Sequence, residues 1–365
     1  MQPVGIGVIG CGNISSAYLT AARKFPILNL IALSDANPAA AEARAAEFGL
    51  AARSVDALLA DPAVEIILNL TVPNAHVDVG LKAIGAGKHV HSEKPLGIAV
   101  AEARRLIEAA AARGLRLGSA PDTFLGGSHQ TARRALDAGL IGRPVGGAAF
   151  FMCPGHERWH PNPGFYYLKG GGPMLDMGPY YVTDLVNLLG PVASVSGVAT
   201  RTRSERVVTS QPQAGARIPV EVATHVAGTL AFASGAVVTM TMSFDVARHR
   251  HGPIELYGEA GSLVVPDPNR FDGKVEFATA AEDWREIATE GPYADGNYRI
   301  LGLADMAQAI RSGRPHRANG ELAFHVLEVM EAFQTSSDTG KAVAISSRPQ
   351  RPAPLAPTLR VGELD

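Results

Sequence analysis

Short apolar runs alternate with helical patterns over the first 120 residues of the chain. The strand-like runs lie at residues 4–9, 28–33, 64–71, 89–91 and 115–119. Between them, as at residues 38–48 and 99–113, the apolar residues have the spacing of helices. Because strands that alternate with helices build βαβ units, the pattern predicts an N-terminal α/β domain with a doubly wound parallel sheet over residues 1–121.

The pattern changes after residue 121. It indicates helices at residues 128–138 and 173–189, a strand at 145–151, alternating strands from 192 to about 277, and two more helices at 300–311 and 321–336. This order predicts a second domain over residues 122–365, of the α+β type, with a large, mostly antiparallel open sheet.

Residues 222–244 contain no Asp, Glu, Lys or Arg and therefore need testing as a membrane span. Threonine, serine and histidine interrupt this stretch, and its large apolar residues occupy alternate positions on both sides of Ala233-Ser234-Gly235. Such alternation is typical of two strands that bury one face. We therefore predict a β-hairpin here and no membrane segment.

Composition narrows the class of protein. The 365 residues include 33 Lys and Arg against 35 Asp and Glu, which argues against binding to nucleic acid or to an anionic membrane. A content of 46% hydrophobic and 19% charged residues excludes a disordered chain. Two cysteines, Cys11 and Cys153, supply neither a disulfide framework nor a four-cysteine zinc site. No signal-peptide pattern precedes the first strand, so we expect a cytoplasmic protein.

A Gly-x-Gly-x-x-Ser motif follows the first strand and opens a helical pattern. Gly10 permits a tight turn and Gly12 permits close approach of a pyrophosphate, which the helix N-terminus at Asn13 and Ile14 would bind. Asp35 ends the second strand, where a carboxylate binds ribose hydroxyls. No Arg or Lys follows it among the next three residues to bind a 2′-phosphate, so NAD is favoured over NADP. The alternative is a glycine turn in a protein that binds no nucleotide.

Further blocks of sequence carry a resemblance to a known family. They are Thr-Val-Pro-Asn-Ala-His at 71–76, Gly-Lys-His-Val-His-Ser-Glu-Lys-Pro at 87–95 and Gly-Gly-Gly-Pro-Met-Leu-Asp-Met-Gly-Pro-Tyr at 170–180. In order and separation they resemble the glucose–fructose oxidoreductase / inositol dehydrogenase (Gfo/Idh/MocA) family over essentially the whole chain. The resemblance implies an NAD(P)-binding Rossmann domain and a sheet domain whose open face often forms homodimer or homotetramer contacts. It also implies an oxidoreductase that acts on hydroxyl groups of sugars, cyclitols or related compounds.

The same resemblance implies roles for individual residues. Glu93 and Lys94 would lie next to the nicotinamide, and Pro95 would be a cis proline that aims Lys94. The residues that would border the ribose and nicotinamide side of the cofactor are Thr71, Pro73, Asn74 and His76.

Lys94, Asp176 and Tyr180 are the candidates for proton transfer. Oxidation of an alcohol needs a group that accepts the hydroxyl proton, and burial beside a nicotinamide cation would lower the pKa of Lys94 for this task. Asp176, Tyr180 and Asp184 recur every four residues, so they share one helix face that is costly to bury without partners. We assign proton transfer to Lys94, a hydrogen bond to the reacting oxygen to Tyr180, and orientation of Lys94 and a substrate hydroxyl to Asp176. The alternative is a polar face turned to water.

Tyr180 departs from the inositol dehydrogenase branch of the family, which has Asp-x-Gly-x-His where this chain has Asp-x-Gly-x-Tyr. Tyrosine, with an ordinary pKa of about 10 against about 6.5 for histidine, is the poorer base near neutral pH. Members of the glucose–fructose oxidoreductase type also carry tyrosine here. The departure leaves two alternatives open: an NAD-dependent lyase or glycosidase that oxidises a sugar carbon only transiently, and a non-catalytic NAD-binding sensor.

Residues 156–160 match His-Glu-x-x-His, but prolines and glycines on both sides leave no room for the helix that a zinc protease needs. We therefore expect no metal site. The aromatic residues that follow suit stacking on a sugar ring and hydrogen bonding to its hydroxyls, so we expect Trp159, His160 and Tyr166 to bind substrate. The alternative is an aromatic plug between the domains.

Overall fold

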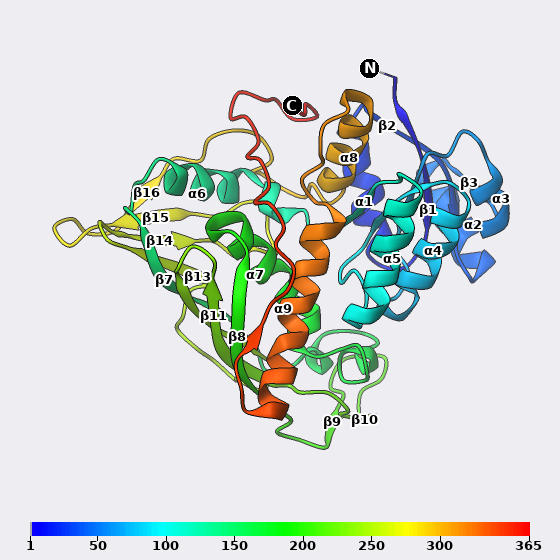
Figure 1. Cartoon of the computed structure of the whole chain (residues 1–365). Coiled ribbons are helices and arrows are strands. Elements are labelled where there is room, and N and C mark those ends of the chain that lie inside the picture. The colour runs from blue at the N-terminus through cyan, green and yellow to red at the C-terminus, as the bar shows by residue number, and fades with distance from the viewer. Residues whose placement is uncertain (1) are drawn as a thin grey trace.

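The computed structural model describes residues 2–365 and consists of a parallel sheet with its helices and a larger open sheet with helices on one face (Figure 1). The parallel sheet has the strand order β3-β2-β1-β4-β5-β6. Its strands are β1 (Val4–Ile9), β2 (Leu28–Ser34), β3 (Ala51–Ala52), β4 (Ile66–Asn69), β5 (His89–Ser92) and β6 (Leu117–Ser119). The helices between them are α1 (Ser15–Ala22), α2 (Pro38–Phe48), α3 (Val55–Ala60), α4 (His76–Gly85) and α5 (Val100–Ala112).

This parallel sheet confirms the predicted Rossmann arrangement. All residues of β1 are buried, as expected for an apolar strand covered by helices on both faces. The strand order reverses direction between β1 and β4, and ligands of such sheets bind in the crevice at the carboxyl ends of the strands at that point. The short strand β3 was not predicted, because its two exposed alanines carry no strand pattern.

The second sheet has nine strands in the order β16-β15-β14-β13-β7-β12-β11-β8-β17. They are β7 (Pro144–Met152), β8 (Val192–Thr200), β11 (His225–Phe232), β12 (Val237–Ser243), β13 (Ile254–Gly258), β14 (Ser262–Val265), β15 (Val275–Ala278), β16 (Arg285–Ile287) and β17 (Val343–Ala344). The pair β7 and β12 is parallel and the other pairs are antiparallel, as predicted for a mostly antiparallel sheet. A separate ribbon joins β9 (Glu205–Val207) to β10 (Arg217–Pro219).

The uncharged stretch at residues 222–244 forms the predicted hairpin. Strands β11 and β12 pair with Leu230 opposite Val238, and both side chains are buried. Among the helices within residues 2–365, none is both long enough and apolar enough to cross a membrane.

Helices cover one face of the large sheet and leave the other open. The chain forms α6 (Gly127–Asp137), α7 (Pro173–Leu189), α8 (Leu301–Ser312) and α9 (Gly320–Thr339). Helices α7 and α9 pack on the sheet and on each other, and α9 also contacts α5 and β6 of the parallel-sheet region. On the opposite face, Val198, Val237 and Tyr257 are exposed, and the strand register places all three on the same side.

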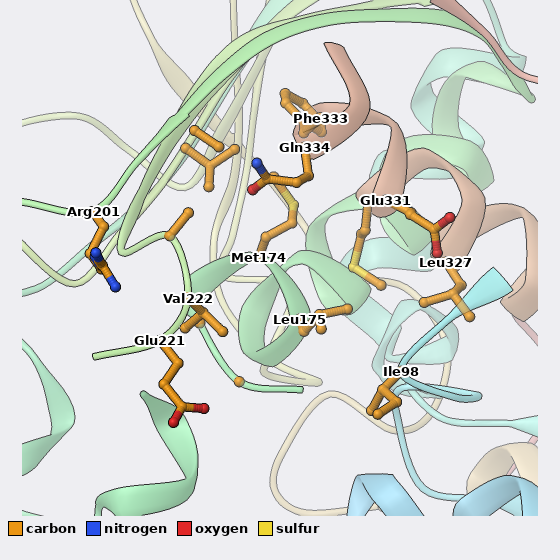
Figure 2. A pocket seen from close by; sticks show the side chains of 16 residues that line it. Ile98, Met174, Leu175, Arg201, Glu221, Val222, Leu327, Glu331, Phe333 and Gln334 are labelled. Atoms are coloured by element: carbon orange, nitrogen blue, oxygen red, sulfur yellow. The ribbon is translucent and has the colours of Figure 1, made fainter. Parts of the chain in front are cut away.

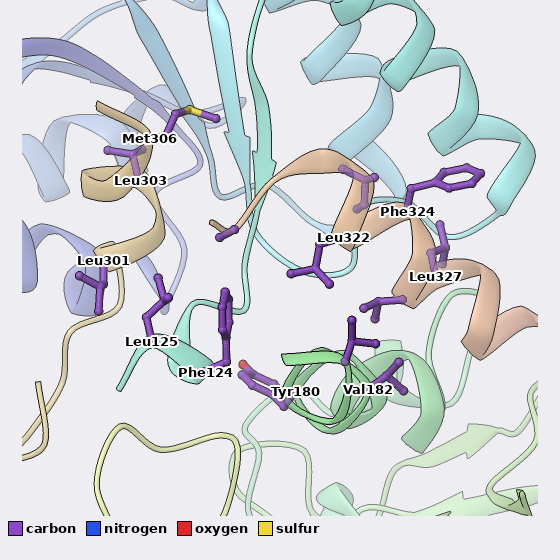
Figure 3. Close-up of a cluster of buried hydrophobic side chains, with 14 of the residues drawn as sticks. Phe124, Leu125, Tyr180, Val182, Leu301, Leu303, Met306, Leu322, Phe324 and Leu327 are labelled. Carbon is purple, nitrogen blue, oxygen red and sulfur yellow. The ribbon is translucent and has the colours of Figure 1, made fainter. Parts of the chain in front are cut away.

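A buried apolar cluster packs α7 against α9 and the segment that contains Phe124. Figure 3 shows Tyr180 of α7 beside Phe124, with Val182 on the side of α7 away from Phe124, and Leu301 of α8 and Leu322 of α9 on other helices of the cluster. Because these side chains are buried, the middle of α7 has a defined position relative to α9. This packing holds the candidate site together.

Candidate functional site

The turn between β1 and α1 has the geometry of a phosphate-binding loop. Gly10 has a φ of +110°, and a Cβ there would lie 2.4 Å from the main chain of Leu70, so only glycine fits. At Gly12 a Cβ would have no other atom within 4 Å, which leaves this side of the turn open to a ligand. Ser15 stands where the motif ordinarily has a small residue, and its buried hydroxyl donates to the carbonyl of Gly12 at 2.7 Å. The turn therefore fits a dinucleotide pyrophosphate.

Asp35 lies at the same turn. Its Oδ2 accepts the main-chain N–H of Cys11 at 2.7 Å, and its Oδ1 accepts that of Asn37 at 2.8 Å. These two contacts fix the carboxylate at the phosphate-binding turn, directly after β2. Arg44 of α2 also reaches the turn: it donates to the carbonyl of Gly12 at 3.4 Å and pairs with Glu47 at 2.6 Å. The prediction did not include this basic group, because it considered only the three residues after Asp35 and Arg44 lies further along, in α2.

The loop after β4 was predicted to border the cofactor, and its residues differ in how far they are exposed to solvent. Asn74 is exposed and Thr71 and Pro73 are half-buried, so these three lie at the surface of the loop. His76 is fully buried, with Nδ1 2.7 Å from the carbonyl oxygen of Pro95 and Nε2 3.0 Å from that of Thr71. His76 therefore connects the loop to the segment after β5 through buried hydrogen bonds, and its side chain is not accessible to a cofactor.

Glu93 and Lys94 follow β5 directly. The Glu93 Oε1 accepts the hydroxyl of Tyr18 at 2.5 Å, and Oε2 accepts the main-chain N–H of Lys94 at 2.8 Å. Tyr18 is a buried residue of α1, so Glu93 links the helix of the phosphate-binding turn to Lys94. The peptide bond between Lys94 and Pro95 is cis, as the resemblance suggested.

Lys94 and Asp176 form an ion pair across the two sheet regions. The Lys94 Nζ donates to the Asp176 Oδ1 at 2.9 Å and to its main-chain carbonyl at 2.6 Å. Asp176 lies in the first turn of α7, which begins at Pro173, and a negative charge near a helix N-terminus is favourable. Both side chains remain partly exposed, at 16% and 17%, so the pair is accessible to small molecules in solution.

The pair stabilises the charged form of each partner. Burial lowers the pKa of Lys94, but the charges of Asp176, Tyr180 and Glu93 outweigh burial and raise it above its usual value. Burial raises the pKa of Asp176, but Lys94 and His156 outweigh burial and lower it to about 2. The expected lowering of the lysine pKa by burial is therefore reversed by its neighbours. In this state Lys94 is a proton donor.

Tyr180 lies between two cations. Its ring centroid is 5.2 Å from the Lys94 Nζ and 5.8 Å from the Arg299 Cζ. Burial raises the pKa of its hydroxyl, and the two cations oppose that rise. Arg299 is held from the other side by Asn269, whose side-chain oxygen accepts from Nη2 at 2.8 Å. Sequence reasoning did not identify Arg299, because its segment has no motif and only the packing of the chain brings it to the site.

The expected aromatic loop lies beside Asp176, and it brings a histidine that was not predicted. The His156 Nε2 is 3.1 Å from the Asp176 Oδ2. Burial lowers the pKa of His156, but hydrogen bonding to Asp176 and Cys153 raises it overall. The rings of His156 and Tyr166 pack with centroids 4.5 Å apart, and the ring of His160 packs on Tyr166 at 5.3 Å.

The signal for His156 was present in the His-Glu-x-x-His match. Its first histidine is the residue that contacts Asp176, and such a contact does not require the helix that a zinc motif needs. Within residues 2–365, no cluster of three or more His, Cys, Asp or Glu side chains has the arrangement needed to hold a metal ion. Glu157 instead pairs with Arg206 at 3.1 Å and accepts a hydrogen bond from Tyr167.

Asp184 does not belong to the site. It shares a helix face with Asp176, as predicted, but its Oδ2 lies 2.8 Å from the Nδ1 of His129 in the core, and both side chains are 0% exposed. The prediction that Asp184 belongs to the same functional group as Asp176 and Tyr180 was therefore wrong. Helical spacing shows which residues share a face of the helix, but it does not show which part of that face is buried in the core. A polar face turned to water is also excluded.

A separate cavity of about 450 Å³ lies behind the N-terminus of α7. Figure 2 shows Met174 and Leu175 on one side of it, Glu331 and Phe333 of α9 on another, and Glu221 across from them. Lys94, Asp176 and Tyr180 do not line this cavity. Gly171 and Gly172, just before α7, are part of the lining.

Comparisons with known proteins agree with this geometry. Residues 4–120 match the model of an oxidoreductase family with an NAD-binding Rossmann fold, and residues 129–264 match the Gfo/Idh/MocA C-terminal domain. A 1,5-anhydro-D-fructose reductase of Ensifer adhaerens is 27% identical over 93% of this chain and 98% of its own length. A levoglucosan dehydrogenase of Pseudarthrobacter phenanthrenivorans is 25% identical over 83% of this chain and 85% of its own.

Solved structures show the same fold. Levoglucosan dehydrogenase in complex with NADH superposes with a TM-score of 0.83 at 21% identity, over 95% of this chain and 100% of that one. An oxidoreductase domain protein from Kribbella flavida gives 0.81 at 25% identity, over 95% and 100% of the two chains. The chain therefore belongs to the Gfo/Idh/MocA family of oxidoreductases, and its N-terminal domain is an NAD-binding Rossmann domain.

Proposed function

We propose that the protein is an NAD-dependent dehydrogenase or reductase of a CH–OH group in a sugar, cyclitol or sugar derivative, with Lys94 as the proton-transfer group. The observation that carries the proposal is the ion pair of Lys94 with Asp176, which joins the end of β5 to the start of α7 at the edge of the dinucleotide crevice. When bound, NAD supplies the hydride acceptor for such chemistry. The residues of the chain move the proton and orient the substrate.

The charge state of the pair favours one direction of proton transfer. Lys94 holds its proton tightly beside Asp176, so it is ready to donate that proton to a carbonyl oxygen that is being reduced. In alcohol oxidation Lys94 must first lose its proton before it accepts one from the substrate hydroxyl. We infer that oxidation rises with pH through the alkaline range and that carbonyl reduction falls over the same range.

The other groups around Lys94 supply orientation. Tyr180, between Lys94 and Arg299, is suited to hydrogen-bond the reacting oxygen. Asp176 orients Lys94 and can accept a hydrogen bond from a neighbouring substrate hydroxyl. Trp159 is 61% exposed beside this pair, which leaves an aromatic surface for a sugar ring. The names of the two curated relatives, both enzymes of anhydro sugars, support a carbohydrate substrate.

A substrate panel tests the proposal. Purified protein is mixed with NAD and single sugars, polyols, anhydro sugars or glycosides, and reduced nicotinamide is followed by its absorbance. Net formation of NADH with a free hydroxyl compound supports the proposal. Cleavage of a glycoside without net NADH supports transient oxidation instead, and tight NAD binding with no turnover across the panel supports a sensor.

We further propose that the open face of the large sheet joins copies of the chain into a homodimer or homotetramer. Val198, Val237 and Tyr257 are 60%, 49% and 38% exposed on this one face, and apolar patches of this kind are typical of interfaces. Light scattering tests it: the wild type is expected to be oligomeric and Val198→Lys to lower the mass. A wild-type protein that is monomeric at micromolar concentration contradicts this proposal.

A further inference from the structure

A chain of three hydrogen bonds runs from the exposed aromatic loop to Lys94. The indole N–H of Trp159 donates to the Nδ1 of His156 at 3.1 Å. The Nε2 of His156 lies 3.1 Å from the Oδ2 of Asp176, and the Oδ1 of Asp176 accepts from Lys94 at 2.9 Å. Each contact uses a different atom, so the four side chains are linked in series.

Trp159 determines which nitrogen carries the hydrogen when the His156 ring is neutral, whereas the charged ring, which the raised pKa of His156 favours near neutral pH, carries hydrogens on both nitrogens. An indole N–H is a donor only, so the Nδ1 atom that it contacts must present a lone pair. In the neutral ring the hydrogen then lies on Nε2, which donates it to the Oδ2 of Asp176. With the opposite tautomer, two hydrogens would meet at Nδ1 and two lone pairs at Nε2.

His156 is held firmly enough to impose this geometry. Its side chain is 10% exposed, and its ring packs on Tyr166 and Phe244 with centroid distances of 4.5 Å each. Its main-chain N–H donates to the hydroxyl of Tyr167 at 3.2 Å. These contacts hold the ring in one orientation towards Asp176.

We propose that His156 is a positioning residue: its Nε2–H holds one oxygen of Asp176 so that the other faces Lys94, and Trp159 selects the tautomer that does so. This inference rests on the proposed function, in which Lys94 and Asp176 transfer the proton. A carboxylate without the histidine could turn about its own bond and offer Lys94 a poorer contact. The family resemblance does not supply this role, because it rests on residues 71–76, 87–95 and 170–180, and His156 lies in none of these blocks.

Nuclear magnetic resonance tests the tautomer without any need for turnover. Full-length protein with ¹⁵N-labelled histidine and tryptophan is titrated from pH 6 to 10. The neutral ring of His156 is expected to carry its hydrogen on Nε2, and the indole N–H signal of Trp159 is expected to shift as His156 titrates, because an imidazolium cannot accept at Nδ1. The groups that face His156 and must be followed in the same titration are Asp176, Cys153, His160 and Tyr166.

Two tryptophan variants complete this test. Trp159→Phe is expected to reduce the preference for the Nε2–H form, whereas Trp284→Phe, which removes the other tryptophan of the chain at a 43% exposed position, should leave it unchanged. A neutral His156 with its hydrogen on Nδ1, or a tautomer preference that Trp159→Phe does not alter, overturns the inference. Either result would leave the proposed function of Lys94 standing.

Kinetics of His156 variants give the second readout. His156→Ala is expected to lower kcat by about tenfold, the usual scale for a lost hydrogen bond to a charged group, and to change the pH profile of kcat with little change in KM. His156→Gln places an amide N–H near Nε2 and should recover most of the loss. The exposed His249→Gln is the matched control. Wild-type kcat and pH profile in His156→Ala, or no recovery in His156→Gln, contradict the role.

Discussion

Two aspartates on one face of α7 each contact a histidine, yet they belong to different parts of the molecule. Asp184 and His129 are 2.8 Å apart with both side chains 0% exposed. Asp176 and His156 are 3.1 Å apart with side chains 17% and 10% exposed, and Asp176 also contacts Lys94. The same residue types at the same helical spacing thus form a core pair in one place and a candidate catalytic group in the other. Burial and the third partner make the difference.

Among the substitutions that distinguish the Asp176–His156 pair from the Asp184–His129 pair, Asp176→Asn is expected to have the largest effect, which is on turnover. Removing this charge leaves Lys94 without its orienting partner, so turnover should fall by roughly a thousandfold. NAD affinity should stay within about threefold, because Asp176 lies outside the phosphate-binding turn. Steady-state rates and NADH fluorescence titration measure the two effects. Turnover within tenfold of wild type would mean that the contact with Lys94 has little role in the reaction.

Asp184→Asn should act on stability and not on the reaction. The substitution removes the carboxylate charge from a fully buried pair and leaves His129 without its counter-charge. The free energy of unfolding should therefore fall by about 3 kcal/mol. Urea denaturation measures this change. The folded fraction should retain wild-type kcat, and a large loss of kcat in folded Asp184→Asn protein would show that the two pairs are not functionally separate.

The Asp176 pair should lose its contribution to stability in acid. The pKa of Asp176 is lowered from 3.8 to about 2, so its interactions contribute fully above about pH 4, by roughly 2 kcal/mol, and are lost as pH falls towards 2. The difference in unfolding free energy between wild type and Asp176→Asn should therefore shrink over this interval. A difference that is constant from pH 5 to pH 2 would contradict the ion pair.

The His129 pair should respond at the opposite end of the pH range. Burial lowers the pKa of His129, but Asp184 outweighs burial and raises it above its ordinary 6.5. Its charged form therefore contributes fully below pH 6.5 and its contribution is lost as pH rises through the raised pKa. The stability gap between wild type and Asp184→Asn should narrow above neutral pH. If the difference in unfolding free energy widens above neutral pH, the assignment of a charged His129 beside Asp184 is wrong.

The sequence was sufficient to predict the parts of the structure that depend on residues close together in the chain. The glycine turn and the alternating strands of the hairpin follow from neighbouring residues, because the positive φ at Gly10 and the two-residue period of β11 are properties of the local main chain. The helix bounds of α7 were also predicted, since Pro173 and Gly190 mark its ends.

The sequence was insufficient where side chains distant along the chain meet. Arg299 reaches Tyr180 from a segment more than a hundred residues later, and His156 reaches Asp176 from a loop that precedes α7. Asp184 shows the converse, since its spacing on the helix suggested function and its burial against His129 decided otherwise. Such contacts depend on tertiary packing, which periodicity does not encode.

The most direct test of the account is the turnover of Lys94→Ala with a substrate found in the panel, alongside its affinity for NADH. The exposed Lys169→Ala serves as the matched control. We predict that turnover of Lys94→Ala falls by at least about a thousandfold, while its affinity for NADH stays within about threefold of wild type. Lys169→Ala should keep the turnover and the NADH affinity of the wild type. Near wild-type turnover in Lys94→Ala would contradict the assignment of proton transfer to this lysine.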